Sequence, residues 1–195
     1  ADLSGATVAI IVGYSSIGAN AFFQASALTS ITIPASVTSI GDYAFYGASA
    51  LTTVTFDTDS SLTSIGGGAF LRASALTSII IPASVTSIGD FAFHQASALT
   101  SITVISSNVL YEDISGVLFN KDGETTLIQY PIGNTSTTYT IPEGVISIGA
   151  NAFRTASALT SITIPASVTT IGTSAFRSAS ALTSITIPEG VTSIG

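Results

Sequence analysis

The chain has 195 residues and a mass of 19.6 kDa; 46% of its residues are apolar and only 8% are charged. An ordinary soluble domain carries about 25% charged residues, so the surface of this protein must be largely neutral. Its 4 Lys and Arg residues against 11 Asp and Glu give a net charge of −7, which disfavours binding to nucleic acid and to anionic membranes. With no Cys and one His, a disulfide framework, a thiolate metal cluster and clusters of imidazoles are excluded.

The sequence repeats itself with a period of 23 residues. The clearest copy, LTSITIPASVTSIGDYAFYGASA at 28–50, recurs almost unchanged at 76–98 and 159–181. A fixed period of this length is typical of a solenoid. Each copy contains the pair Ala-Phe, whose phenylalanines are Phe22, Phe45, Phe70, Phe93, Phe153 and Phe176.

The first part of a copy predicts a β-strand. Leu28, Ile31 and Ile33 follow the L-x-x-L-x-L pattern of a leucine-rich repeat, in which alternation turns these side chains toward the core. Pro34 lacks an N–H group and therefore ends the strand. The residues between the apolar positions, Ser30 among them, then point outward.

The second part of a copy predicts a short apolar segment and a turn. Gly41 permits a sharp change of direction, and Asp42 is expected to cap a short helical turn. That turn brings Ala44 and Phe45 back into the core. One copy is therefore one coil, and its stability should come from stacking on its neighbours.

We therefore predict a mainly β repeat solenoid with 23-residue coils, parallel strands stacked along one face and short helical turns. The expected organisation is one domain over 1–195, with regular repeats at 8–104 and 136–195 and an expanded repeat at 105–135. Within the expanded repeat, GVLFN and TTLIQY flank Lys121-Asp122-Gly123-Glu124, which predicts a protruding β-hairpin. A smaller expansion, TFDTDSSL, adds two residues between Leu51 and Leu76.

These copies resemble the BspA-like, or Treponema pallidum type, leucine-rich repeats of bacterial and protist surface proteins, whose pattern is roughly L-x-x-I-x-I-P-x-x-V-x-x-I-G-x-x-A-F-x-x-C. The resemblance covers almost the whole chain and includes the expanded repeat. It implies a secreted or cell-surface protein that acts in adhesion or protein–protein interaction. The Cys of the pattern is replaced by Ala25, Ala48, Ala73, Ala96, Ala156 and Ala179.

Residues with catalytic or metal-binding chemistry are few. His94 occupies a variable position that is expected to be a solvated edge, without an orienting partner nearby. Asp57 and Asp59, with Glu112-Asp113, could offer oxygen ligands to Ca²⁺, although loop solubility is the simpler interpretation. Asn134 begins a glycosylation sequon that matters only in a eukaryotic secretory pathway. We expect no enzymatic activity and no cofactor.

The outward positions of the first strand carry hydroxyl side chains in nearly every coil, and Ile80 is the exception. The simplest explanation is that Thr and Ser suit a pleated surface without forming a sticky apolar patch. The alternatives are recognition of an extended protein or a glycan, or a regular lattice that binds ice. This candidate interaction face consists of Ser30, Thr32, Thr53, Thr55, Ser78, Ser101, Thr103, Thr138, Thr140, Ser161, Thr163, Ser184 and Thr186.

Neither end of the sequence shows a polar cap. The apolar run at 8–12 begins the array, and the sequence stops within a repeat at 187–195. Uncapped coils expose core and strand edges, so we expect either further repeats of a longer chain or a second copy of the protein to cover them.

The leading functional hypothesis is an extracellular or cell-surface protein that binds a protein or glycan on a host or neighbouring cell. The alternative is a filament subunit that stacks end to end with copies of itself, and ice binding is the least favoured. The sequence has no initiator Met, no leader and no span of about 20 apolar residues, which suggests a processed secreted protein or a piece of a longer one, not inserted in a membrane.

Overall fold

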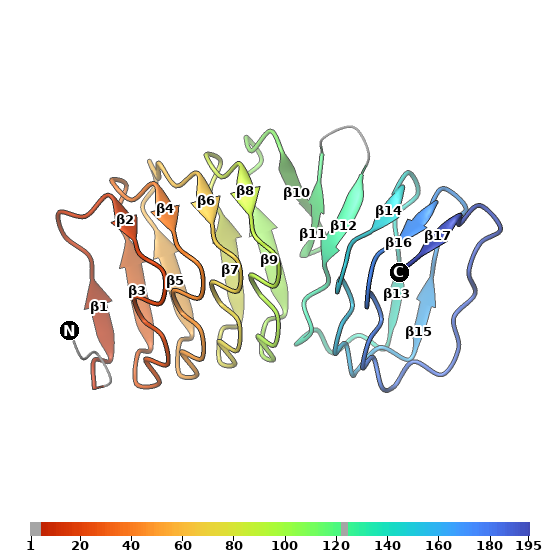
Figure 1. Ribbon diagram of the computed structural model, residues 1–195, viewed down its shortest axis with the longest axis horizontal. Coiled ribbons are helices and arrows are strands. Elements are labelled where there is room, and N and C mark those ends of the chain that lie inside the picture. The colour runs from red at the N-terminus through yellow and green to blue at the C-terminus, as the bar shows by residue number, and fades with distance from the viewer. Residues whose placement is uncertain (1–4, 122–124) are drawn as a thin grey trace.

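The computed structural model describes residues 5–121 and 125–195, which form an elongated stack of coils (Figure 1). The predicted solenoid is confirmed. Each coil contributes strands and turns, and the described residues contain no helix and hence none that could cross a membrane. The two ends of the chain lie at opposite ends of the stack.

Two rows of strands run along the solenoid, one on each side of the coil. The first row contains the longer strands: β1 (Val8–Ile10), β3 (Ser30–Ile33), β5 (Thr53–Phe56), β7 (Ser78–Ile81), β9 (Ser101–Val104), β13 (Thr138–Thr140) and β15 (Ser161–Thr163). The second row contains two-residue strands: β2 (Ser16–Ile17), β4 (Ser39–Ile40), β6 (Ser64–Ile65), β8 (Ser87–Ile88), β14 (Ser147–Ile148), β16 (Thr170–Ile171) and β17 (Ser193–Ile194). Equivalent positions of successive coils pair in parallel, such as Ser30 with Thr53.

The Ala-Phe turns form a third edge, from which a row of phenyl rings enters the core. Phe45 and Phe70 are fully buried and stack with their ring centroids 5.1 Å apart. Phe93 continues the stack at 5.8 Å from Phe70, and after the expanded repeat Phe153 stacks on Phe176 at 5.2 Å. The expectation of one interior ring per coil is therefore confirmed.

The segments predicted to be helical turns form tight turns. Their N–H groups donate alternately to carbonyls of the same coil and to carbonyls of the next coil. The N–H of Tyr46 donates to the carbonyl of Tyr43 at 3.1 Å, whereas the N–H of Phe45 donates to Ala69 of the next coil at 2.7 Å. Tyr43 has a left-handed backbone with φ of 55°, which prevents a helix from continuing. The capping role predicted for Asp42 is wrong, because its Oδ1 accepts the N–H of Gly67 in the next coil at 2.7 Å.

The expanded repeat forms β10 (Tyr111–Ile114), β11 (Val117–Asn120) and β12 (Thr126–Gln129). β11 and β12 pair antiparallel, as predicted for the hairpin, but its Asp122-Gly123-Glu124 turn lies outside the described residues. The hairpin does not protrude. β12 pairs in parallel with β14 of the second row, and the side chains of Leu118, Phe119 and Leu127 are buried. Burial of these side chains is the reason that the hairpin joins the wall of the solenoid.

A second hairpin, between β10 and β11, was not predicted. Ser115 and Gly116 have φ of 54° and 80° and form the two-residue turn between the paired Ile114 and Val117. Two successive left-handed residues suit the twist of a hairpin. This turn lies against β9, where the carbonyl of Gly116 accepts the N–H of Ile102 at 2.9 Å.

Candidate functional site

The hydroxyl side chains predicted to form the interaction face do point away from the core. All of them are exposed except Ser30 and Ser101, which are half-buried. The alternating apolar residues of the same strands, such as Ile31 and Ile79, are buried. Ser184 and Thr186 differ from the others, because they are exposed in a segment that has no strand pairing.

The first row of strands is not one continuous sheet. It divides into β1-β3-β5, β7-β9 and β13-β15, and within the described residues no hydrogen bond joins β5 to β7. The second row stays continuous at that point, since β6 and β8 pair at Ser64 and Ser87. The coils containing β5 and β7 are therefore separated on one side only.

One feature of the sequence is particular to this opening. The two-residue expansion after β5 lengthens the segment that must return to the second row. Pro82 also has no N–H to donate to the carbonyl of Phe56, but Pro34 and Pro165 hold the same place after β3 and β15, which are paired. At the two neighbouring junctions this bond is present: Asp57 donates to Ile33 at 3.1 Å and Ile105 donates to Ile81 at 3.0 Å.

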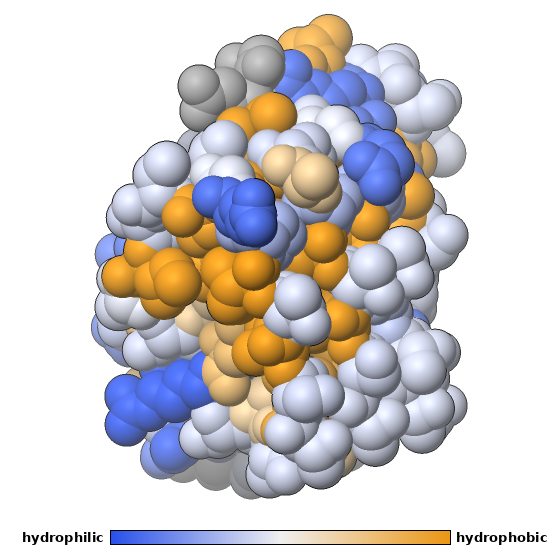
Figure 2. Space-filling model, turned by 90° about the vertical axis from the view of Figure 1, so that its right-hand side faces the viewer, coloured by the Kyte–Doolittle hydropathy of each residue, from blue (hydrophilic) through white to orange (hydrophobic). Residues whose placement is uncertain are grey.

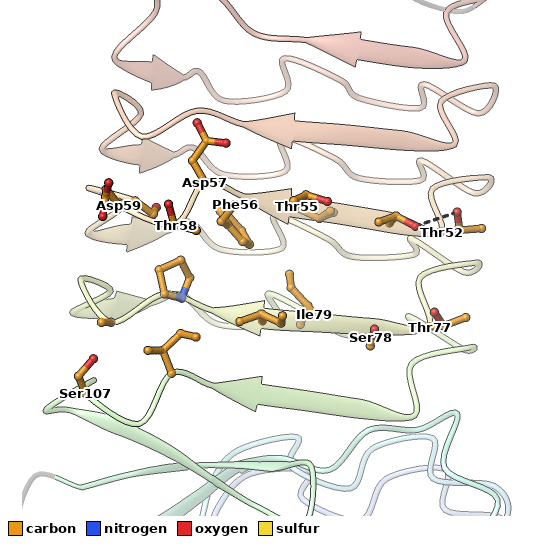
Figure 3. Close-up of a pocket in the computed structure, with 17 residues that line it drawn as sticks. Thr52, Thr55, Phe56, Asp57, Thr58, Asp59, Thr77, Ser78, Ile79 and Ser107 are labelled. Atoms are coloured by element: carbon orange, nitrogen blue, oxygen red, sulfur yellow. Dashed lines mark hydrogen bonds between the residues drawn. The ribbon is translucent and has the colours of Figure 1, made fainter.

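The opening forms a groove of about 660 Å³ on the hydroxyl face. Figure 3 shows β5 and β7 as its two walls, with Phe56 directed toward β7 and Asp57 directed away toward the preceding coil. Ile80 and Ile105 are 50% and 42% exposed beside it. Ile80 thus places an apolar outward side chain at the groove; the other exposed apolar outward positions, Val8 and Ile10 in register with Ser30 and Thr32, lie in the first coil.

The groove combines an apolar centre with polar surroundings. Phe56, Ile80 and Ile105 offer apolar surface, whereas Thr55 and Ser78 offer hydroxyl groups from opposite walls. An apolar centre with a polar rim is the usual composition of a protein-binding surface. The sequence contained both signals, namely the expansion and Ile80, but nothing in it showed that they meet.

A second set of threonines has a structural role that sequence reasoning missed. The Oγ1 of Thr52 donates to the carbonyl of Thr29 in the preceding coil at 3.0 Å, and Thr100 donates to Thr77 at the same distance. In the described part of the chain Thr77 makes no such bond to Thr52. Instead, the hydroxyl groups of Thr52 and Thr53 lie 3.4 Å apart (Figure 3).

The acidic side chains considered as calcium ligands do not meet at one site, and two of them accept backbone N–H groups instead. Asp57 accepts the N–H of Ala35 through Oδ2 at 3.2 Å, and Asp113 accepts the N–H of Val104 through Oδ1 at 2.7 Å. Over residues 5–121 and 125–195 no group of three or more His, Asp or Glu side chains is placed to hold a metal ion. These two carboxylates therefore connect segments of the chain.

His94 is buried, with 5% of its surface exposed, so the expectation of a solvated edge is wrong. The reason is its packing: the ring of Phe91 contacts it edge to face at 5.7 Å, and Arg154 from beyond the expanded repeat lies over Phe91. Burial, with smaller contributions from the charges of Arg154 and Arg72, lowers the pKa of His94 to about 4. A neutral imidazole of such low basicity is unsuited to general-base catalysis at neutral pH.

Comparisons with known proteins point to one family. The chain matches the BspA type leucine rich repeat region in six copies, across residues 15–137 and 131–195. No protein with a curated description matches it.

Solved structures of similar proteins agree with this match. The pneumococcal vaccine antigen PcpA is 31% identical with a TM-score of 0.84, over 91% of this chain and 43% of its own. A leucine-rich repeat protein from Eubacterium ventriosum is 34% identical with a TM-score of 0.82, over 100% of this chain and 57% of its own. A leucine rich cell surface protein from Faecalibacterium prausnitzii is 26% identical with a TM-score of 0.52, over 97% of this chain and 77% of its own. The chain thus spans about half the length of the first two relatives.

Proposed function

The chain belongs to the family of BspA-type leucine-rich repeat proteins, and from that premise we propose that it is a non-enzymatic adhesion protein of the cell surface or extracellular space. Two of its relatives are described as a vaccine antigen and as a cell surface protein, which supports this location. The partner is a protein, bound on the hydroxyl face. Repeats are a scaffold, so the argument for the partner must come from this face.

The groove between β5 and β7 is the observation that carries the proposal. Here, between two stacked coils, the hydroxyl face offers apolar surface through Phe56, Ile80 and Ile105. Apolar side chains in the centre of an interface supply most of its binding energy, and the polar rim excludes water around them. The remaining hydroxyl face then contributes register and specificity.

An extended protein segment fits this groove better than a glycan does. Within the described residues β5 and β7 have no hydrogen bonds to each other, and their facing edges keep backbone donors and acceptors. Cα atoms of the two strands still come within 8 Å of each other, less than twice the usual strand spacing, so a bound segment lies along the mouth of the groove or parts the strands further. Extended segments bind such edges through main-chain hydrogen bonds, while pockets accept alternate side chains. The hydroxyl groups of Thr55 and Ser78 add further partners on both walls.

The experiment tests whether Ile80 anchors the partner. Purified protein is applied to immobilised matrix proteins and to a glycan array, and adhesion is compared between the wild type and Ile80→Thr. Thr occupies the paired position at Thr103, so the substitution is compatible with the strand. We expect the affinity for a bound matrix protein to fall roughly tenfold, with an unchanged melting temperature.

The matched control is Thr163→Ile, which places the same apolar side chain at an outward position of β15, away from the groove. It should neither weaken nor strengthen adhesion. Binding to glycans alone, no binding to any matrix protein, or full adhesion by Ile80→Thr would contradict the proposal.

A second candidate is end-to-end stacking into a filament. Figure 2 shows apolar side chains gathered across the end of the molecule that carries the last coil, where Ile187 and Ile194 are exposed. At the other end, Val8 and Ile10 are exposed on the first coil. Contact between unlike ends propagates into a fibre. Sedimentation that detects only monomers at high concentration would contradict this candidate.

The interrupted first row gives no support to ice binding. A lattice that orders water would need evenly spaced hydroxyl groups along the whole face. The breaks after β5 and after β9 divide the face into three parts.

A further inference from the structure

A second surface, on the edge formed by the Ala-Phe turns, gathers exposed aromatic rings and arginines. We call it the aromatic ridge; it consists of Phe23, Tyr43, Tyr46, Arg72, Phe91 and Arg154. Phe23, Tyr43 and Phe91 are 46%, 46% and 41% exposed. The ridge is distinct from the groove, which is lined by β5, β7 and the loops that follow them.

The side chains of the ridge hold one another in place. Phe23 stacks on Tyr46 with centroids 4.8 Å apart, and the guanidinium of Arg72 lies over the Tyr46 ring at 5.7 Å. Arg72 also donates from Nη1 to the Tyr46 hydroxyl at 2.9 Å and from Nε to Oε1 of Gln95 at 2.7 Å. Rigid aromatic and arginine side chains lose little entropy on binding and are the commonest anchors of interfaces.

Two of the exposed rings occupy a turn position at which the fold accepts Asn or Gly. Tyr43 and Phe91 have left-handed backbones, with φ of 55° and 60°, which bulky residues rarely adopt. The same place in other coils holds Asn20, Gly68 and Asn151, residue types that suit this conformation. Unfavourable aromatic residues at exposed positions point to a use outside the fold.

Gly68 makes room for one of these rings. A Cβ added to Gly68 would lie 2.6 Å from Cε1 of Tyr43, so the ring of Tyr43 rests over the neighbouring glycine. The glycine run that follows Ile65 therefore leaves space for a side chain of the neighbouring coil. In that space the ring of Tyr43 lies across two coils.

The ridge holds two of the few positive side chains of a negatively charged protein. The chain has 4 cationic side chains against 11 acidic ones, and Arg72 and Arg154 are both on the ridge. Each of them hydrogen-bonds neutral side chains, and within residues 5–121 and 125–195 neither forms an ion pair. Asp42 and Asp90 directly precede Tyr43 and Phe91 in the chain, and Asp42 accepts the N–H of Gly67.

The geometry of the rings selects the chemistry of the partner. Phe23 comes from the coil before Tyr46 and Arg72 from the coil after it, so both faces of the Tyr46 ring are covered, while the ring of Tyr43 meets it edge to face at 6.1 Å. The groups of the ridge left for a partner are therefore the guanidinium groups of Arg72 and Arg154, which favour carboxylate oxygens. A sugar ring would instead need an open aromatic face. We propose that the aromatic ridge binds an acidic protein segment that also carries aromatic side chains.

The probe for this proposal is a fluorescent copolymer of glutamate and tyrosine, with polylysine and a sialylated oligosaccharide as comparison ligands. We expect saturable binding of the copolymer that weakens as salt is added, because guanidinium–carboxylate contacts are screened. Two variants are tested separately, Arg72→Gln and Tyr43→Asn. Asn is present at the equivalent positions 20 and 151, so Tyr43→Asn keeps a residue that the turn accepts.

Each variant should weaken copolymer binding by roughly tenfold or more, as expected for an interface anchor. Arg177→Gln is the matched control, since Arg177 follows the half-buried Phe176 in its coil, outside the ridge, and it should change the affinity by less than about twofold. Ile80→Thr should leave binding unchanged, which separates this surface from the groove. Failure of the wild type to bind the copolymer, an equal loss in Arg177→Gln, or preference for the sialylated oligosaccharide would overturn the proposal.

Discussion

The junction between β3 and β5 and the junction between β5 and β7 are made from nearly the same repeat, yet only the first is closed. β3 and β5 pair from Ser30 with Thr53 to Ile33 with Phe56, whereas β5 and β7 belong to different sheets. The second row and the turn edge remain bonded at both junctions. A two-residue expansion can therefore open one side of a solenoid without separating its coils.

The boundary between β9 and the expanded repeat shows the opposite outcome. There the first row is also interrupted, but the hairpin of β10 and β11 closes the gap. Asp113 accepts the N–H of Val104 through Oδ1 at 2.7 Å, and the carbonyl of Gly116 accepts the N–H of Ile102 at 2.9 Å. An interrupted ladder thus becomes a groove only where no other segment bonds to the open strand edge.

The largest expected effect comes from removing a ring that supports both junctions. Phe70 is fully buried and stacks between Phe45 and Phe93 at 5.1 and 5.8 Å. Phe70→Ala should lower the free energy of unfolding by about 3 to 5 kcal/mol, because it leaves a cavity between coils. Urea denaturation measures this loss. Phe22→Ala, at the half-buried end of the stack, should cost clearly less, and equal losses would contradict a continuous spine.

Removing the side chain that joins the loop after β9 to the preceding coil should have the next largest effect. Asn108 is buried; its Nδ2 donates to the carbonyls of Pro82 and Val85, and its Oδ1 accepts the N–H groups of Leu110 and Tyr111. Asn108→Ala removes these four bonds, which we expect to cost about 2 to 4 kcal/mol. Chemical denaturation measures the loss, and a change within about 0.5 kcal/mol would contradict the role of Asn108 in holding this loop.

The pH dependence of stability separates His94 from the exposed or half-buried residues at the same place in other coils. Its pKa is lowered to about 4 in the folded protein, by burial first and then by Arg154 and Arg72, so the unfolded chain binds the proton more readily. The stabilising effect is complete above about pH 6.5 and is lost as the pH falls toward 4, by about 1 to 3 kcal/mol. Denaturation of the wild type and His94→Gln across this range measures it. Parallel curves would contradict the burial of His94.

Removing the threonine hydroxyl groups should have the smallest effect on stability, and it compares the two junctions most closely. Thr52→Val removes a 3.0 Å bond to Thr29 and should cost about 0.5 to 1 kcal/mol. Thr77 occupies the same place in the next coil but makes no bond to Thr52, so Thr77→Val should be nearly neutral. Equal costs in thermal denaturation would show that the junction is closed in solution.

The periodicity of the sequence was sufficient to predict the coil, the inward phenylalanines and the outward hydroxyl groups. Each of these depends only on alternation and on the spacing of the repeat. The protruding hairpin was wrong because the apolar residues of both its strands, Leu118 and Leu127 among them, find a place in the core. The turn at Ser115 and Gly116 was missed because only the Asp-Gly pair was taken as a hairpin signal.

The sites were harder to predict, because they depend on contacts between coils. Ile80 and the expansion after β5 belong to successive coils, and their meeting follows from stacking. His94 looked exposed because its cover, Arg154 over Phe91, comes from beyond the expanded repeat. The aromatic ridge has the same origin, since Phe23, Tyr46 and Arg72 belong to three successive coils.

Amide hydrogen exchange at three equivalent positions tests the opening of the first row most directly. Thr55 and Thr103 lie in strands paired with the preceding coil, and Ile80 has the same place in the coil that faces the groove. The amide of Ile80 should exchange at least about tenfold faster than those of Thr55 and Thr103. Equal protection of the three amides would contradict the account.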